Sequence, residues 1–295
     1  MDRYPAPARP IVAAMRAAAA AEPARAVSFQ GAPGANSHIA LADLFGDALP
    51  LPCFSFEDAI DAVKDGSAAR AMIPIENSQH GRVADIHFLL PESGLSITHE
   101  YFLPIHYSLM GTGALDQVRE AISHPQALGQ CRRWLRARGI QPVAYDDTAG
   151  AAARVAELAD PSVAALAPPL AARTYGLAAL EEGVADSRDN MTRFVVLARE
   201  AAAPESGPVM TTLTFEVKNV PAALYKAMGG FATNGVNMTK LESYQRGGSF
   251  AATEFFADIE GRPDDPAVAR ALDELAYHSK WVRLLGTYAI ARPRG

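Results

Sequence analysis

The alternation of strand-like and helix-like segments most strongly constrains what this chain can fold into. In the first two thirds of the sequence, short apolar segments at 26–29, 121–123 and 143–145 each end in a polar or glycine-containing turn. A segment with helical spacing follows each of these turns. A repeated strand–turn–helix unit predicts parallel β-sheets with helices on their faces. We therefore expect an α/β fold in this part of the chain.

Hydrogen-bonding side chains occupy the turns at the ends of the predicted strands. In open α/β sheets, ligands bind beyond the carboxyl ends of the strands, so we expect these turns to converge on one cleft. The turns contain Ser37, Asn77, Gln126, Thr148 and Thr192. A purely structural role is also open at two of them, because Thr148 suits a helix cap and Glu76 suits the orientation of its own loop.

The sequence changes character after residues 201–208, which are rich in small residues and proline and are typical of a linker. The 209–295 region that follows has the order β-α-β-β-α-β. Its strands are predicted at 210–217, 236–244, 250–259 and 281–289, with helices at 221–231 and 266–277. This order is typical of α+β ferredoxin-like domains. We read residues 1–25 as a flexible or partly helical tail, which leaves 26–200 as the α/β domain.

The composition argues against several classes of protein. The formal net charge is −6 without a basic block, so we expect no nucleic-acid partner and no membrane partner. Arg16 interrupts the apolar stretch near the N-terminus, so we expect no signal peptide and a cytoplasmic protein. Cys53 and Cys131 are predicted to be buried reduced thiols. The spacing of the histidines and glycines predicts neither a metal site nor a bound cofactor.

Five short motifs follow one another in a fixed order. They are Phe29-Gln30-Gly31 with Gly34-Ala35-Asn36-Ser37, Pro74-Ile75-Glu76-Asn77-Ser78, Ser123-His124-Pro125-Gln126, Asp147-Thr148-Ala149, and Asn190-Met191-Thr192-Arg193-Phe194. In this order they resemble the motifs of the prephenate dehydratase family. In the C-terminal region, Leu224-Tyr225-Lys226 and residues 235–243 resemble the ACT regulatory domain. The chain thus resembles a monofunctional member of the family that carries this domain, over residues 26–292.

The resemblance implies conversion of prephenate to phenylpyruvate, water and carbon dioxide, a step of phenylalanine synthesis. It also implies two α/β lobes like those of type II periplasmic binding proteins, with the active site between them. Thr192 matches the catalytic threonine and would assist the departure of hydroxide. Arg193 would hold negative charge, and Phe194 would form an apolar wall or simply belong to the core. The remaining implied substrate-binding residues are Ser37, Glu76, Asn77, Ser78 and Gln126.

The resemblance of the C-terminal region implies feedback binding of phenylalanine across a homodimer or homotetramer. The implied allosteric positions are Ala222, Ala223, Leu224, Asn237, Glu242 and Ser243. The sequence departs from the family at one of these positions, Ala222, and at the two residues that follow Ser243. Ala222 stands where the family has glycine, which adds a methyl group to the backbone. Tyr244-Gln245 stands where the family has Arg-Pro, which removes a fixed cation, so ligand choice stays open.

Three alternatives to prephenate dehydration remain at this point. Arogenate dehydratase acts on the amino analogue of prephenate, and the motifs do not separate the two activities. A non-catalytic amino-acid sensor would combine an ACT domain with an inactive two-lobed module. The presence of Asn77, Thr192 and Arg193 argues against that loss of activity. The third alternative, a periplasmic solute-binding protein, conflicts with the predicted absence of a signal peptide.

Overall fold

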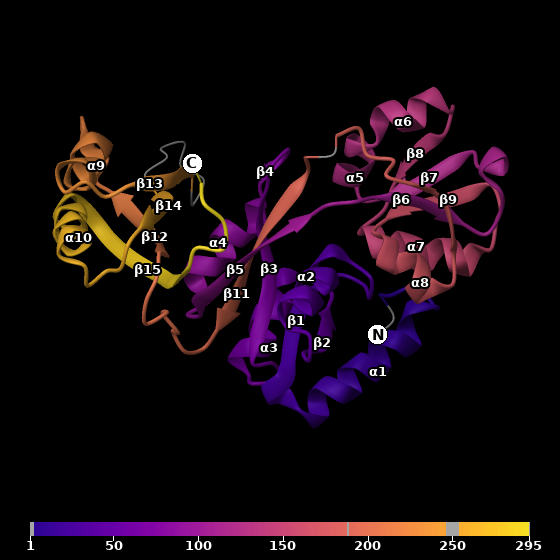
Figure 1. The fold of residues 1–295 in the computed structure, drawn as a ribbon, viewed down its shortest axis with the longest axis horizontal. Coiled ribbons are helices and arrows are strands. Elements are labelled where there is room, and N and C mark those ends of the chain that lie inside the picture. The colour runs from indigo at the N-terminus through magenta and orange to yellow at the C-terminus, as the bar shows by residue number, and fades with distance from the viewer. Residues whose placement is uncertain (1–2, 188, 246–253, 295) are drawn as a thin grey trace. The chain divides into compact units, whose positions relative to one another are not determined.

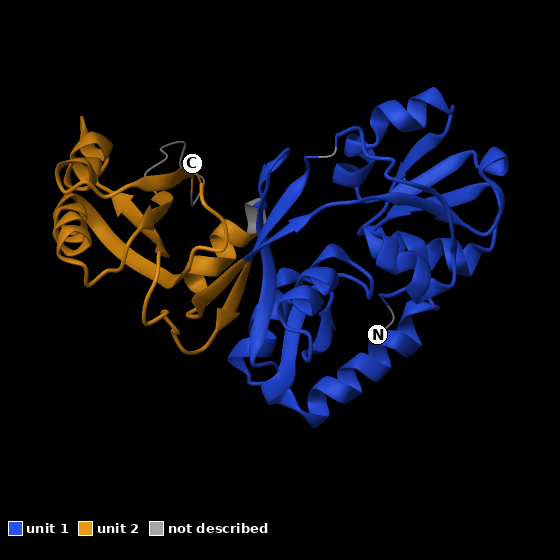
Figure 2. Ribbon diagram, in the orientation of Figure 1, with its two compact units in different colours: residues 1–83, 101–194 blue, residues 84–100, 195–295 orange. Residues whose placement is uncertain are grey.

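Three β-sheets organise the described residues in the computed structural model, which describes residues 3–187, 189–245 and 254–294 (Figure 1). The chain divides into two compact units (Figure 2). Unit 1 contains Met1–Val83 and Tyr101–Phe194, and unit 2 contains Ala84–Glu100 and Val195–Gly295. Because these boundaries fall inside two strands of the first sheet, the units do not coincide with the predicted domains 26–200 and 209–295.

The first sheet has the strand order β2-β1-β3-β11-β5, and the short β4 pairs with β3. Its strands are β1 (Ala26–Gln30), β2 (Leu49–Cys53), β3 (Arg70–Asn77), β4 (Gly81–Arg82), β5 (Ser96–Pro104) and β11 (Met191–Ala198), and the helices along them are α2 (Asn36–Leu44), α3 (Phe56–Lys64) and α4 (Ala84–Glu92). β1 pairs in parallel with both β2 and β3, as the strand–turn–helix pattern predicted. A Ser55–Asp58 capping box begins α3, also as predicted.

One expectation for β3 is wrong. Pro74 predicted an edge strand or a strand end, yet β3 lies between β1 and β11. The pairing with β1 ends at Phe29 and Met72, two residues before the proline. The missing N–H of Pro74 therefore removes no hydrogen bond from that ladder.

The second sheet has the strand order β10-β6-β9-β7-β8. Its strands are β6 (Ser108–Gly111), β7 (Glu120–Ser123), β8 (Gln141–Ala144), β9 (Val163–Ala167) and β10 (Ala178–Glu182), and its helices are α5 (Pro125–Gln130), α6 (Arg132–Ala137), α7 (Thr148–Leu158) and α8 (Pro169–Tyr175). The 3-10 turn η2 (Leu115–Gln117) precedes β7, and a second one, η1 (Pro23–Arg25), precedes β1 of the first sheet. The predicted single helix after β7 is divided at Cys131 into α5 and α6.

The chain passes twice between these two sheets, whose parts within unit 1 we call the first and second lobes. β5 leads through Ile105 to β6, and β10 leads through residues 183–190 to β11. The crossing segments bond to each other, because the Ile105 N–H donates to the Asn190 carbonyl at 2.9 Å. The Val184 N–H likewise donates to the Tyr107 carbonyl at 3.1 Å. Two lobes with paired crossover segments confirm the predicted type II periplasmic-binding-protein-like architecture.

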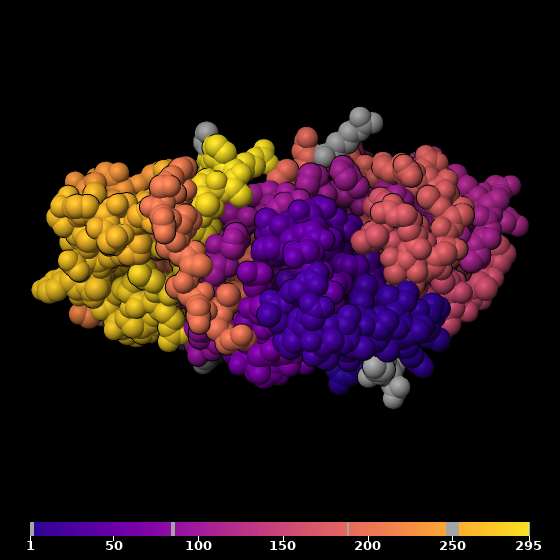
Figure 3. All heavy atoms as spheres, turned by 60° about the horizontal axis from the view of Figure 1, so that its bottom comes forward, coloured from indigo at the N-terminus to yellow at the C-terminus, as the bar shows by residue number. Residues whose placement is uncertain are grey.

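The N-terminal segment is a packed helix, where we predicted a flexible or partly helical tail. Helix α1 (Ala8–Ala21) buries Val12 fully, and Tyr4 ahead of it is only 4% exposed. The Arg16 guanidinium donates to the carbonyl of Pro52 at 3.1 Å. The indigo segment lies along the surface of unit 1 in the space-filling view (Figure 3).

The C-terminal module (residues 209–294) is a four-stranded antiparallel sheet with the order β13-β14-β12-β15. Its elements are β12 (Val209–Val217), α9 (Ala223–Thr233), β13 (Met238–Tyr244), β14 (Glu254–Glu260), α10 (Pro266–His278) and β15 (Ser279–Ala289). Leu213, Phe215 and Leu275 are fully buried in its core. This order confirms the predicted ferredoxin-like fold. Most of the predicted turn at 245–248 and the start of the predicted strand 250–259 lie outside the described residues.

Ala222, at the N-terminus of α9, has a left-handed backbone conformation with φ +61°. This conformation costs a residue with a Cβ about 1 kcal/mol, and glycine adopts it freely. We expect Ala222→Gly to raise the free energy of unfolding by up to about 1 kcal/mol. Urea unfolding measures the change. Ala232→Gly, at an exposed helical position of α9, should instead lower stability by several tenths of a kcal/mol, roughly. A loss of stability in Ala222→Gly would contradict the argument from strain.

Candidate active site

Thr192 lies near the start of β11, two residues beyond the crossover between the lobes. Its Oγ1 accepts a hydrogen bond from the Asn77 side-chain amide at 3.0 Å. Asn77 is the last residue of β3, the neighbouring strand. Because the Thr192 oxygen already accepts a hydrogen bond, its own O–H is left to donate to another group. The arrangement therefore presents a partly exposed hydroxyl as a hydrogen-bond donor.

Backbone groups fix the orientation of Asn77. Its Oδ1 accepts the N–H groups of Gln79 and His80 at 3.0 and 3.1 Å. Its Nδ2 is therefore directed toward Thr192 and toward Asn190 Oδ1, which lies 2.7 Å away. An amide that donates and accepts at fixed partners cannot flip without losing several hydrogen bonds.

Ser78 fastens the loop after β3 to the loop before β11. Its backbone N–H donates to the Met191 carbonyl at 2.8 Å. Its hydroxyl donates to the Asp189 carbonyl at 3.2 Å and accepts from the Met191 N–H at 2.9 Å. These contacts place the Ser78 hydroxyl in a structural role, which differs from the substrate contact implied by the resemblance. Asp189 is a turn residue, and its carbonyl accepts the hydrogen bond from the Ser78 hydroxyl.

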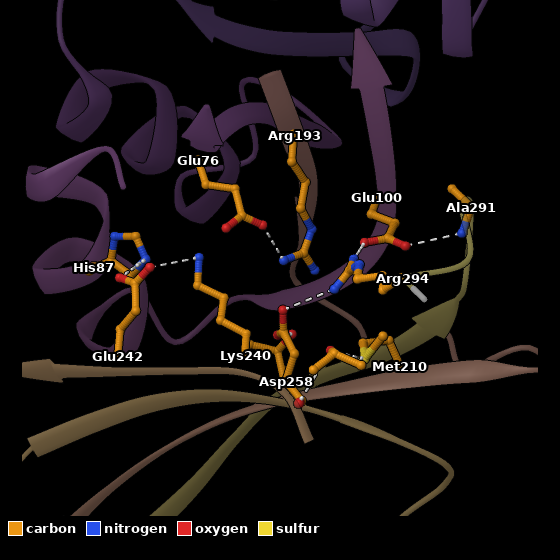
Figure 4. A network of polar contacts seen from close by, with 12 residues as sticks. Glu76, His87, Glu100, Arg193, Met210, Lys240, Glu242, Asp258, Ala291 and Arg294 are labelled. Atoms are coloured by element: carbon orange, nitrogen blue, oxygen red, sulfur yellow. Dashed lines mark hydrogen bonds and ion pairs between the residues drawn. The ribbon is translucent and has the colours of Figure 1, made fainter. Parts of the chain in front are cut away.

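Glu76 and Arg193 form an ion pair, with Oε1 and Nη1 2.9 Å apart (Figure 4). The Arg193 side chain is only 1% exposed. Successive side chains of a strand point to opposite faces, so Arg193 points away from the face that carries Thr192. This geometry favours a structural role for Arg193 over the predicted contact with a substrate carboxylate beside Thr192. It also favours the structural alternative for Glu76.

The second lobe contributes residues from α5 and from the turn before it. The His124 Nδ1 accepts the backbone N–H of Gln126 at 3.3 Å and caps the helix. The Gln126 side chain is exposed and available to a ligand. At the end of the helix, Gln130 is buried, and its Oε1 accepts from Asn190 Nδ2 at 2.7 Å. Its Nε2 lies 2.9 Å from the Nδ1 of His80. Hydrogen bonds from Gln130 through Asn190 to Asn77 therefore connect α5, which contains Gln126, to the turns of Asn77 and Thr192.

Two histidines in unit 1 accept backbone hydrogen bonds through an unprotonated Nδ1. His38 accepts the Gly34 N–H at 3.1 Å and stacks on Phe29, with ring centroids 5.4 Å apart. Burial lowers the pKa of His38. Burial, together with the nearby charge of His80, lowers the pKa of His124. Both native histidines therefore favour the neutral form.

These lowered pKa values predict that the protein loses stability in mild acid. The unfolded chain takes up protons as the pH falls through the ordinary histidine pKa of about 6.5, before the native state does. The free energy of unfolding should then decrease toward lower pH, by up to about 1.4 kcal/mol per pH unit for each histidine. Urea unfolding between about pH 7.5 and pH 5.5 measures this slope. A double variant, His38→Gln with His124→Gln, should have a shallower slope, and an unchanged slope would contradict the assignment.

Two other predicted site residues, Ser37 and Phe194, are buried. Ser37 is 6% exposed in the first turn of α2. Phe194 is 1% exposed, which favours the alternative that its ring belongs to the core. Thr148 begins α7, where Asp147 is the residue that caps the helix.

Burial raises the pKa of both free thiols, Cys53 and Cys131, to about 12, so both stay protonated.

The predicted allosteric residues occupy different parts of the C-terminal module. Ala222, Ala223 and Leu224 form the start of α9, whereas Asn237 and Ser243 are exposed at and beside β13. Glu242 lies 3.1 Å from the Lys240 ammonium and accepts from the Tyr244 hydroxyl at 3.2 Å (Figure 4). Within unit 2, the ring of Tyr244 stacks on His87 with centroids 5.3 Å apart. Tyr244 thus places a packed ring where the family has an arginine.

Three residues of the polar framework were missed as site residues in the sequence: His80, Gln130 and Asn190. Each stands within or beside a motif that was recognised, so their position was visible in the sequence. Their mutual contacts join positions 50 and 60 residues apart. Spacing along the chain carries no signal of such pairs.

The fold and this site define a two-lobed α/β protein with a polar site where the lobes meet and a ferredoxin-like C-terminal module. A sequence profile described as Prephenate dehydratase matches residues 27–202. The chain therefore belongs to the prephenate dehydratase family. None of the helices in the described part of the chain has the length and hydropathy needed to cross a bilayer. The described residues also contain no cluster of three or more potential metal-ligating side chains.

Individual relatives agree with this family assignment. A bifunctional N-acyl-homoserine lactone acylase/prephenate dehydratase of Komagataeibacter europaeus is 47% identical over 90% of this chain and 95% of its own length. Arogenate dehydratase/prephenate dehydratase 1 of Arabidopsis thaliana is 34% identical over 89% of this chain and 71% of its own. The solved prephenate dehydratase of Arthrobacter aurescens in complex with L-Phe is 32% identical and covers 90% of both chains, with a TM-score of 0.83.

Proposed function

We propose that this protein catalyses the dehydration and decarboxylation of prephenate to phenylpyruvate. The hydrogen bond from Asn77 to Thr192 carries this proposal. Loss of the ring hydroxyl and of the carboxylate on the opposite ring carbon makes the ring aromatic, so much of the driving force lies in the substrate. The enzyme has to assist hydroxide departure and hold a dianion. A positioned O–H donor meets the first requirement.

The Thr192 hydroxyl is a weak acid and acts by hydrogen bonding to the departing oxygen or by relaying a proton to it. The donation from Asn77 to Thr192 Oγ1 makes the O–H a better donor, because linked hydrogen bonds polarise one another. With Arg193 on the opposite face of the sheet, substrate carboxylates need other donors. The exposed Gln126 amide and backbone N–H groups beyond β1 are the groups we assign to them.

Turnover assays test this function directly. Purified protein with prephenate should form phenylpyruvate, and an inactive wild-type protein would contradict the proposal. Arogenate should be tried in parallel, because it yields phenylalanine and the sequence motifs do not separate the two substrates. Faster turnover of arogenate than of prephenate would reassign the substrate and leave the reaction class unchanged. We place the reaction in the cytoplasm, where Cys53 and Cys131 stay reduced.

We further propose that the C-terminal module is an ACT-type regulatory domain that binds phenylalanine and forms dimers or tetramers. The ferredoxin-like order and the L-Phe complex of the Arthrobacter aurescens relative support this proposal. Calorimetry should detect phenylalanine binding, and phenylalanine should slow turnover. Sedimentation measures the oligomeric state. If calorimetry detected no heat of binding at saturating phenylalanine, the regulatory role would be refuted.

A second candidate activity is hydrolysis of N-acyl-homoserine lactones. The relative from Komagataeibacter europaeus, at 47% identity, is named for both activities. In unit 1, a cavity of about 260 Å³ lined in part by Ile39, Leu103 and Pro169 offers apolar surface to an acyl chain. Release of homoserine lactone from acylated substrates measures this activity. Ile39→Asp should lower the release while prephenate turnover persists, and no release by the wild-type protein would exclude the candidate.

A further inference from the structure

A chain of side-chain hydrogen bonds, through the buried amides of Gln130 and Asn190 and the half-buried amide of Asn77, ends at Thr192. It runs from His80 Nδ1 to Gln130, then to Asn190, to Asn77 and finally to Thr192 Oγ1. The links measure 2.9, 2.7, 2.7 and 3.0 Å in this order. Asn190 is 2% exposed and Gln130 is 7% exposed. Side-chain amides buried to this extent are held by their hydrogen bonds, so each link restricts its neighbour.

We propose that Asn190 and Gln130 are positioning residues that set the direction of the Asn77 amide and, through it, the donor function of the Thr192 hydroxyl. This inference rests on the proposed dehydratase function.

The donors and acceptors of this hydrogen-bond network can be assigned in only one consistent way. Asn77 Nδ2 has two hydrogens, and three acceptors lie within reach: Asn190 Oδ1 at 2.7 Å, Thr192 Oγ1 at 3.0 Å and the Met191 carbonyl at 3.2 Å. When Asn190 Oδ1 takes one hydrogen, the other is directed to the Thr192 side. If Asn190 were flipped, its Nδ2 would face the Nδ2 of Asn77, two donors without an acceptor. The Gln130 Oε1 prevents that flip because it accepts from Asn190 Nδ2.

Asn190 also lies at the connection between the two lobes, so a change in the relative position of the lobes would shift its side chain. Its backbone carbonyl accepts from Ile105 in the other crossover segment at 2.9 Å. Its side chain bonds to α5 of the second lobe. Asn190 thus belongs to one crossover segment and is bonded to the other segment and to the second lobe. It therefore links the relative position of the lobes to the alignment of Thr192, two residues further along the chain.

A double-mutant cycle tests the inference. Asn190→Ala should lower kcat for prephenate by about 10-fold to 100-fold, with KM within about threefold, because the donor is misaligned while the substrate contacts remain. In a Thr192→Val background, Asn190→Ala should have almost no further effect on kcat, since it acts through Thr192. A purely structural role would lower activity equally in both backgrounds, and that result would overturn the proposal.

Conservative variants refine the cycle. Asn190→Asp keeps an acceptor for Asn77 and should recover part of the loss. Gln130→Glu keeps the acceptor for Asn190 and should retain more activity than Gln130→Ala. Gln117→Ala is the matched control, because that side-chain amide closes a surface turn by accepting the Ala114 N–H. It should leave kcat unchanged. Equal losses of kcat in Gln130→Glu and Gln130→Ala would contradict the proposed positioning role of Gln130.

A second readout does not depend on turnover, so it separates this inference from the proposed function. In the wild-type protein, nuclear magnetic resonance should show the Asn77 side-chain amide hydrogens protected from exchange with solvent. Asn190→Ala should remove this protection while backbone amides of β3 keep theirs. If the Asn77 side-chain amide stayed equally protected in Asn190→Ala, the proposed positioning role of Asn190 would be overturned, whether or not the protein turns over prephenate.

Discussion

Thr192→Val is expected to lower kcat for prephenate by about 10²-fold to 10³-fold. Valine keeps the β-branched shape and removes the hydroxyl that accepts from Asn77. The leaving oxygen then has no positioned donor, so the loss falls on the chemical step while KM stays within about threefold. Steady-state kinetics of phenylpyruvate formation measures both constants.

Two variants serve as controls for this result. Thr192→Ser keeps a hydroxyl at the same place and should retain at least about a tenth of wild-type kcat. Thr174→Val removes a hydroxyl that donates to the Leu170 carbonyl within α8, and kcat should not change. A fully active Thr192→Val protein would show that the leaving oxygen is assisted by another group. A rise in KM without a fall in kcat would assign Thr192 to binding alone.

Arg193→Ala is expected to lower the free energy of unfolding by about 3 kcal/mol or more. The substitution removes one of the largest fully buried side chains and leaves the Glu76 carboxylate without its 2.9 Å partner. Denaturant unfolding measures the loss. Arg133→Ala is the matched control, because that side chain is 77% exposed and lies 3.6 Å from Asp186. Its effect should stay below about 1 kcal/mol.

The same variant separates two roles for Arg193. If Arg193 held a substrate carboxylate, Arg193→Ala would mainly raise KM and leave the folded state stable. The position of Arg193 on the face opposite Thr192 predicts the reverse. A stable Arg193→Ala protein with a greatly raised KM would overturn our placement of the side chain.

The sequence could predict most of the fold because its signals were local. The parallel pairing of β1, the Ser55–Asp58 capping box and the β-α-β-β-α-β order all follow from short-range pattern and were found in the structure. One local signal misled. Pro74 indicated an edge although β3 is an inner strand, because the strand pairing that decides this is not local.

By itself, the sequence determined which turns carry hydrogen-bonding side chains, and it predicted that the turns of Asn77, Gln126 and Thr192 form one site. The tertiary structure alone decided which way those groups point. Alternation along β11 puts Thr192 and Arg193 on opposite faces, and burial places Phe194 in the core. The links from Asn190 to Gln130 and to Asn77 join residues 60 and 113 positions apart. Donor direction in such a network depends on every partner at once, and no spacing along a chain encodes it.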